Sequence, residues 1–187
     1  MEPVSGTVAE LWRWPVLGMA PERLRAARLG ARGMAGDGIH LVVSGEEVLD
    51  ADVLADWSAA YPFNVDSAID PEHPPYALVV GPPDRARRWR WGDPQLAQAL
   101  AAALGRPVEL RRQPERASPI LVSAQPGVPV HVRLAFDEPP ERLAGHELEF
   151  SAGVRLAVTG PAGRRGGVEA RVLSGGRVMV GEPFALR

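Results

Sequence analysis

The stretch LAVTGPAGRRGG, residues 156–167, joins two runs that have the pattern of strands. In the first run, Val154, Leu156 and Val158 alternate with other residues, and this period of two predicts a strand with one buried face. Residues 168–173 form the second predicted strand. The residues between the runs are rich in glycine and carry two arginines but no nucleophile, so the sequence predicts a turn whose chemistry is limited to binding anions.

The rest of the chain is also cut into short segments, because 20 glycines and 19 prolines are spread along its 187 residues. This spacing favours a strand-rich fold with many turns over a helical bundle. We therefore predict a mainly β fold with a few short helices. The predicted strands cover residues 6–14, 25–29, 38–43, 76–80, 86–91, 107–112, 119–123, 130–136, 146–150, 154–159, 168–173, 177–180 and 183–186.

Two helices are predicted from their end signals and apolar faces. Residues 93–105, DPQLAQALAAALG, begin with an aspartate and a proline and end with a glycine, which are the preferred cap residues. Residues 50–60 place Val53, Leu54 and Trp57 on one side, and the Tyr61-Pro62 step ends that segment. A short helical turn is predicted at 139–143.

The domain organisation is predicted to be a single unit over residues 1–187. Residues 63–75 have turn chemistry and little periodicity, so an N-terminal part, 1–62, and a C-terminal part, 76–187, joined by this loop are the alternative.

The charge balance gives the molecule no strong overall field. A formal net charge of −2 and a pI near 6.1 do not draw a protein onto nucleic acid or an anionic membrane. No run of about 18 apolar residues is present, and the first residues lack the pattern of a secretory signal. We expect a cytoplasmic protein that does not bind membranes.

Two residue types are missing, and their absence excludes several chemistries. With no cysteine, the chain has no thiolate nucleophile and no thiolate ligand for zinc, iron–sulfur clusters or molybdenum. All 21 basic residues are arginine, so a phosphate-binding lysine of the Walker type and a Schiff-base lysine are excluded as well.

The remaining candidate catalytic groups form no known motif. None of the four histidines, His40, His73, His131 and His146, is spaced for a helical metal site, so no metal ligands are predicted. We expect His40 and His131 on strand faces with a hydrogen-bond partner. The sequence also lacks the G-x-S-x-G motif of serine hydrolases. No catalytic residue is assigned.

Residues 85–94, RARRWRWGDP, alternate arginine and tryptophan. Such a stretch can stack on bases and neutralise phosphates. It is also typical of an amphipathic strand whose Trp89 and Trp91 enter a core while Arg88 and Arg90 face solvent. We favour the structural interpretation, and weak binding of single-stranded nucleic acid is the third functional alternative.

The order of the motifs resembles that of the MOSC domain family, which includes the C-terminal part of molybdenum cofactor sulfurase. Residues 8–43, VAELWRWPVLGMAPERLRAARLGARGMAGDGIHLVV, are similar to the family's first strand and its "tyrosine-proline-valine-lysine-serine" and "glycine-aspartate-arginine" turns. Residues 88–110 resemble its tryptophan strand and helix, and residues 175–186, GGRVMVGEPFAL, resemble its closing strand pair. The family's lysine and serine are Leu17 and Gly18 here, and its arginine after aspartate is Gly38.

This resemblance implies a closed or partly closed β-barrel and a site that handles a molybdenum cofactor. The family's functional cysteine follows a strand similar to residues 154–159, and its place falls among Ala162, Gly163, Arg164 and Arg165, so no cysteine is available. The resemblance assigns cofactor-binding positions to Asp37, Arg133 and Thr159. Arg164 and Arg165 are added as candidates because a guanidinium can pair bidentately with a phosphate.

We therefore expect a divergent MOSC-like protein without sulfur-carrier activity. The expected ligand is an anionic small molecule, of a molybdopterin type if the resemblance extends that far. A noncatalytic module that binds another protein is the alternative.

Overall fold

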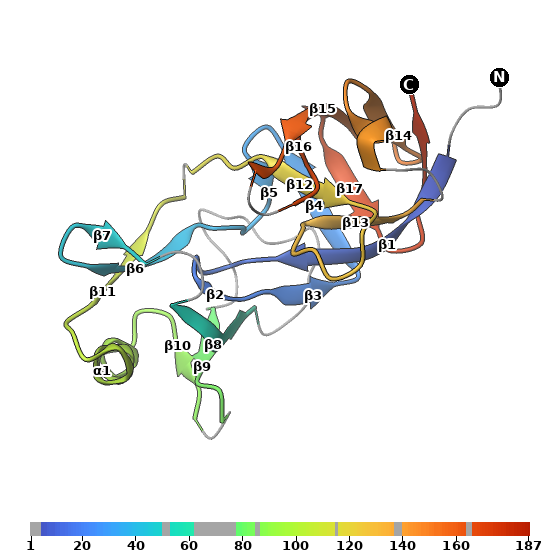
Figure 1. Ribbon diagram of the computed structural model, residues 1–187. Coiled ribbons are helices and arrows are strands. Elements are labelled where there is room, and N and C mark those ends of the chain that lie inside the picture. Colours follow the sequence, from blue (N-terminus) through green and yellow to red (C-terminus); the bar gives the residue numbers. More distant parts are fainter. Residues whose placement is uncertain are drawn as a thin grey trace. The chain divides into compact units, whose positions relative to one another are not determined.

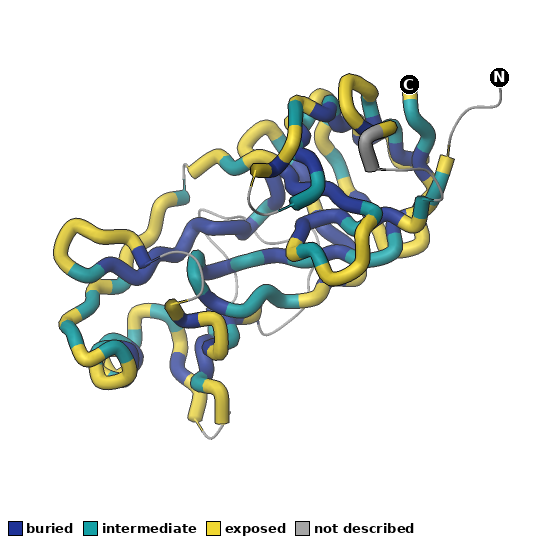
Figure 2. The backbone as a smooth tube through the Cα atoms, in the orientation of Figure 1, coloured by how far each residue is buried: buried dark blue, intermediate teal, exposed yellow. Residues whose placement is uncertain are grey.

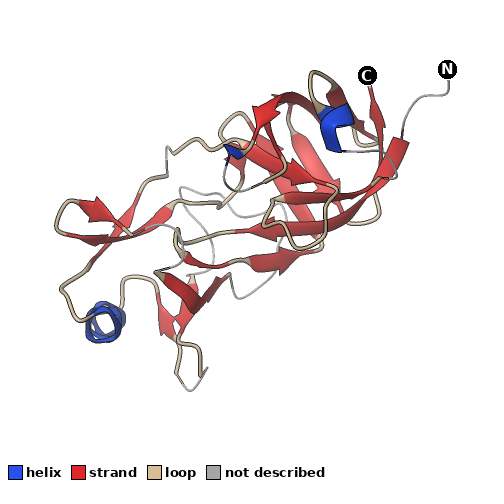
Figure 3. Ribbon diagram, viewed as in Figure 1, coloured by secondary structure: helices blue, strands red, loops and turns tan. Residues whose placement is uncertain are grey.

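A computed structural model of the chain describes residues 5–49, 53–61, 78–84, 87–114, 116–136, 140–163 and 166–187. Strands dominate it, as Figure 3 shows, and the predicted mainly β class is confirmed. The chain forms two compact units: unit 1 comprises Met1–Arg13, Arg23–Ala35 and Ala117–Arg187, and unit 2 comprises Trp14–Glu22 and Gly36–Arg116. The segment 63–75 lies outside the described residues, and each unit contains residues from both sides of it.

In unit 1, seven strands of the described chain close a barrel, which can be followed in Figure 1. All neighbours in the ring are antiparallel except β12 and β13, which run parallel. The short strand β3 (Glu22–Leu24) extends the sheet beside β1. The ring order is β1 (Ser5–Arg13), β13 (Val132–Ala135), β12 (Ile120–Ser123), β16 (Val168–Ser174), β15 (Arg155–Pro161), β14 (Glu147–Phe150), β18 (Pro183–Leu186) and back to β1.

The barrel closes around alternating apolar residues. Val154, Leu156 and Val158 are all buried, as the period of two predicts, whereas Arg155 is exposed. Phe150 and Phe184 meet inside the unit with ring centroids 6.1 Å apart. These residues belong to one hydrophobic cluster drawn entirely from unit 1, so the barrel has its own core.

Unit 1 also contains a three-stranded sheet, β17 (Gly176–Met179), β4 (Ala26–Gly30) and β5 (Gly33–Met34), in that order. The helical turn predicted at 139–143 is a 3₁₀-helix, η1 (Pro140–Leu143), apart from Pro139, which lies outside the described residues. Leu143 at its end is fully buried and ties the turn to the core.

Unit 2 contains two small sheets with a second hydrophobic cluster. In β6, four successive residues from His40 to Val43 are buried, and Figure 2 shows this as a continuous dark segment. One sheet has the order β10 (Trp89–Arg90), β9 (Val79–Gly81), β8 (Leu54–Ala60) and β2 (Met19–Ala20). The other has the order β11 (Glu109–Arg112), β6 (His40–Ser44) and β7 (Glu47–Val48).

The helix predicted at 93–105 is confirmed as α1 (Pro94–Leu104), also in unit 2. The Asp93 side chain accepts a hydrogen bond from the Gln95 backbone N–H, at 2.8 Å. Gly105 ends the helix at φ 67°, a left-handed conformation that glycine adopts at little cost. Leu96 and Leu100 form the buried face.

The helix predicted at 50–60 is wrong, because residues 54–60 form strand β8, whereas residues 50–52 lie outside the described part of the chain. β8 runs parallel to β2 with a register shift, and antiparallel to β9. This irregularity separates the buried Leu54 and Trp57 by three positions, the spacing of a helix face. Beyond it, Trp57, Ala59 and Tyr61 are buried at the spacing of two that a strand requires.

Candidate functional site

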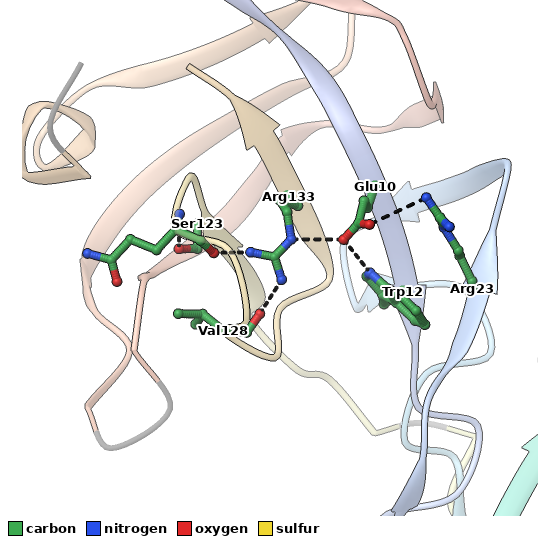
Figure 4. A network of polar contacts seen from close by, with 7 residues as sticks. Glu10, Trp12, Arg23, Ser123, Val128 and Arg133 are labelled. Atoms are coloured by element: carbon green, nitrogen blue, oxygen red, sulfur yellow. Dashed lines mark hydrogen bonds and ion pairs between the residues drawn. The ribbon is translucent and has the colours of Figure 1, made fainter. Parts of the chain in front are cut away.

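Arg133, which the resemblance assigns to the cofactor, lies on β13, and its side chain is only 14% exposed. Its Nε donates to Glu10 Oε2 at 2.9 Å, and one terminal nitrogen donates to the carbonyl oxygen of Val128 at 2.6 Å. The other terminal nitrogen donates to the carbonyl oxygen of Gln125. All three guanidinium nitrogens are therefore bound to the chain itself, as Figure 4 shows.

Glu10, on the neighbouring strand β1, has further partners. The Trp12 indole N–H donates to Oε2 at 3.1 Å, and Arg23 makes an ion pair with Oε1 at 3.4 Å (Figure 4). These donors hold the pKa of Glu10 below its ordinary value, first through the hydrogen bond from Trp12 and then through that from Arg133. Sequence reasoning missed Glu10, because an acidic residue within a strand gives no signal of a partner more than 100 positions away.

The loop between β12 and β13, residues 124–131, is bound at both ends as well as by Arg133. Near its start, the Ser123 hydroxyl oxygen accepts from the Gln125 backbone N–H at 3.0 Å. At its end, the buried His131 ring accepts at Nδ1 from the Leu121 backbone N–H at 2.9 Å. His131, expected on a strand face, lies in the loop one position before β13, and the expected hydrogen-bond partner is the Leu121 N–H.

The glycine-rich turn of residues 160–167 packs on this loop. Ala162 is buried in a small cluster with Leu121 and Val130, against which Val128 also packs. The Ala162 backbone N–H donates to the Gly167 carbonyl at 3.0 Å. A Cβ at Gly167 would lie 2.5 Å from the Val122 carbonyl oxygen, which is too close for any other residue.

Thr159 stands just before this turn, where β15 is irregular. The register with β16 shifts between Val158 and Gly160, which makes Thr159 the extra residue of a bulge. Its side chain is exposed, and its hydroxyl donates to the Glu169 carbonyl at 3.1 Å. The remaining two candidates of the turn, Arg164 and Arg165, lie outside the described residues.

Asp37 belongs to unit 2, whereas Arg133 and Thr159 belong to unit 1. Its buried carboxylate accepts from the Trp14 backbone N–H at 2.8 Å, and the Gly38 N–H donates to the Trp14 carbonyl at 2.7 Å. Further along, the His40 N–H donates to the Pro15 carbonyl at 3.2 Å. The Trp14-Pro15-Val16 and Gly36-Asp37-Gly38 motifs, more than 15 positions apart in the sequence, are therefore in contact.

His40 is the first residue of β6 and is 2% exposed. Its Nδ1 is 3.2 Å from the Pro15 carbonyl oxygen, and its ring meets that of Trp91 edge-on at 4.8 Å. Burial lowers the pKa of His40 to about 4, an effect that the Pro15 hydrogen bond opposes and the Arg112 charge adds to. His40 is therefore neutral at pH 7, and its ring bridges the Pro15 carbonyl and Trp91 within unit 2.

Around Trp89, the alternation of arginine and tryptophan is that of an amphipathic strand, as the structural interpretation predicts. Trp89 is buried and stacks with Trp57, with ring centroids 6.1 Å apart, while Arg88 and Arg90 are exposed. The Arg87 guanidinium lies 5.5 Å from the centroid of the Trp89 ring. The Trp89 ring is therefore covered by other side chains and is not presented to a base.

No group of three or more histidine, aspartate or glutamate side chains is arranged to hold a metal ion within the described ranges. None of the helices in the described part of the chain has the length and apolarity needed to cross a membrane.

Comparison with known proteins adds no assignment to this geometry. No protein-family model matches the chain, and the search of curated proteins finds no significant match.

Proposed function

We propose that the protein is a divergent MOSC-like barrel that binds a small anion and has no sulfur-carrier activity. The observation that carries the proposal is the glycine-rich turn of residues 160–167, which packs through Ala162 and Gly167 at the end of a barrel strand. The closed barrel and the order of the sequence motifs support the resemblance to the family.

The charge of unit 1 favours an anionic ligand. Unit 1 contains 13 arginines against nine acidic residues, whereas unit 2 contains eight arginines against 14 acidic residues. Two of the unit 1 arginines, Arg164 and Arg165, belong to the turn, and the sequence alone assigns them to the site. A guanidinium binds phosphate with two parallel hydrogen bonds, so the ligand class we propose is a phosphate-bearing small molecule.

The residues do not fit the family's molybdenum chemistry. The sequence offers no thiolate as a molybdenum ligand, and Arg133 already donates to Glu10 and to two carbonyls of its own chain. The proposed ligand is therefore defined by its phosphate group, which pterin phosphates and simpler phosphates share.

The test is a titration with inorganic pyrophosphate, read by calorimetry and by the thermal unfolding midpoint, Tm. A ligand that binds only the folded state at 100 times its Kd stabilises that state by about 2.7 kcal/mol. We expect pyrophosphate to raise the Tm of the wild type and to leave that of Arg164→Ser/Arg165→Ser unchanged. The matched control is Arg25→Ser/Arg171→Ser, which removes the same charge from exposed positions of unit 1 and should retain the response.

If the control variant loses the rise in Tm to the same extent, only net charge matters. If millimolar pyrophosphate does not raise the Tm of the wild type, the proposal is refuted. Transfer of persulfide sulfur by the purified protein, or one molybdenum atom per chain, would also contradict it.

A noncatalytic interaction module is the second candidate function. It is favoured by Met179 and Val180, adjacent residues that are 45% and 40% exposed where β17 ends. Under this alternative, pyrophosphate does not change the Tm. Capture of a partner protein is then lost in Met179→Ser/Val180→Ser and retained in Arg164→Ser/Arg165→Ser.

A further inference from the structure

We infer that Arg133 and Glu10 form a clamp that fixes the position of the glycine-rich turn without contacting the ligand. This inference rests on the proposed function where it concerns anion binding. It assigns Arg133 a different role from the one that the family resemblance implies, because its guanidinium faces the protein's own carbonyls. The chain of contacts runs from β1 through β13 and the loop 124–131 to the turn.

First, Glu10 anchors the clamp in a fixed orientation. Its two carboxylate oxygens bind Arg133, the Trp12 indole and Arg23, and Arg23 also lies 5.8 Å from the centroid of the Trp12 ring. A carboxylate with three donors has little freedom to rotate. Arg133 is therefore oriented by a group that is itself held from two strands, β1 and β3.

The second step is that Arg133 holds the loop by its main chain. Its terminal nitrogens donate to the carbonyls of Gln125 and Val128, three positions apart in the loop (Figure 4). The planar guanidinium can bind these two carbonyls and Glu10 at once, because its donors point in fixed directions. A lysine has a single ammonium group and cannot reproduce this geometry.

The third step is that the loop and the turn touch closely. Gly166 faces Val128, whose nearest side-chain carbon would lie 3.2 Å from a Cβ at that position. Val128 also packs against the cluster that contains Ala162, and Gly167 lies against Val122 and Ser123. Because Val128 contacts Gly166 and also packs against the Ala162 cluster, we expect a displaced loop to displace the turn.

The test measures the turn directly by hydrogen exchange of the Ala162 amide, which bonds across the turn to Gly167. The reference is the Gly181 amide, which bonds to the Val8 carbonyl in the same unit and outside the clamp. In Arg133→Lys we expect exchange at Ala162 to rise about tenfold more than at Gly181. The matched control, Arg171→Lys, changes an exposed arginine on β16 and should alter neither amide.

Pyrophosphate affinity is measured in the same variants and should fall about tenfold in Arg133→Lys, in parallel with the loss of protection at Ala162. Glu10→Gln keeps an oxygen acceptor for Arg133 and should give an intermediate loss in both readouts. Leu148→Ala, which weakens the barrel core, should lower overall stability without the selective effect at Ala162.

Three results would separate the possibilities. Equal acceleration at Ala162 and Gly181 in Arg133→Lys would overturn the clamp, because Arg133 would then only stabilise the barrel. Weaker pyrophosphate binding with unchanged exchange would also overturn it, because Arg133 would then contact the anion itself. Selective exchange at Ala162 in a protein that binds no pyrophosphate would support the clamp and refute the proposed function.

Discussion

Arg133, Asp37 and Thr159, three residues assigned to a cofactor by family resemblance, each use their side chain to bind a main-chain group of their own unit. Arg133 binds two carbonyls, Asp37 binds the Trp14 N–H, and Thr159 binds the Glu169 carbonyl. Such a side-chain partner satisfies a main-chain donor or acceptor, and leaving that group unpaired is costly where water cannot reach it. A residue that a family resemblance assigns to a cofactor can therefore serve the fold of its own unit instead.

The lowered pKa of His40 predicts that the stability of unit 2 depends on pH. The His40 pKa falls from the ordinary value of 6.5 to about 4 on folding. Between these values the unfolded chain binds the proton and the folded chain does not, so the free energy of unfolding falls as the pH falls. At about 1.4 kcal/mol per unit, the loss from pH 7 to pH 4 is roughly 3 kcal/mol.

The measurement is urea unfolding at a series of pH values between 7 and 4. In His40→Gln the slope of stability against pH should decrease, whatever the stability at pH 7. The exposed His146 provides the control, because His146→Gln should keep the wild-type slope. Equal slopes in the wild type and His40→Gln would contradict the assignment of this pH dependence to His40.

At the scale of elements, local signals predict α1 and fail for β8. Asp93 and Gly105 lie at the ends of their own helix, so the sequence alone is enough to identify them. In β8, the burial of Leu54 and Trp57 depends on pairing with β2, more than 30 positions earlier. A window of neighbouring residues cannot contain that information, and tertiary pairing overrides the local pattern.

The end cap of α1 can be tested by a single substitution. Asp93→Ala removes the acceptor for the Gln95 N–H and should lower the stability of unit 2 by about 1 kcal/mol. Asp93→Asn keeps a side-chain oxygen and should lose much less. Urea unfolding followed by helix circular dichroism checks both, and equal losses for the two variants would show that the hydrogen bond is not the source.

The glycine-rich turn is tested by comparing two of its glycines. Gly163 and Gly167 both have positive φ, at 56° and 75°, but only Gly167 lies against neighbouring backbone. Gly163→Ala should cost about 1 kcal/mol for its left-handed backbone alone. Gly167→Ala must in addition displace the Val122 carbonyl, so its loss, measured by urea unfolding, should be clearly larger. Equal losses would mean that the turn does not pack on the end of β12.

At the scale of the whole molecule, barrel closure is the feature that sequence patterns predict least directly. The β1 and β13 strands that close the ring pair across about 120 positions, and the Glu10–Arg133 ion pair spans the same separation. Strands at residues 6–14 and 130–136 are predicted from the sequence, and β1 and β13 lie there. The pairing of those strands, and with it the clamp, follows from the geometry of a closed sheet, which is a property of all seven strands together.

The two units have separate hydrophobic clusters, and this leads to the last prediction. Leu148 belongs to the barrel core and Leu100 to the core of unit 2, and both are fully buried. Replacing either by alanine leaves a cavity and should lower the free energy of unfolding by about 2–5 kcal/mol. Because no residue belongs to both clusters, each cavity should weaken its own unit most.

Amide exchange distinguishes the units through one reporter in each. The Val158 N–H bonds to the His146 carbonyl in the barrel, and the Trp91 N–H bonds to the Leu78 carbonyl in unit 2. Leu148→Ala should accelerate exchange at Val158 more than at Trp91, and Leu100→Ala should do the reverse. If each variant accelerates exchange of both amides equally, the two units open as one cooperative structure, and a cavity in either core destabilises both units.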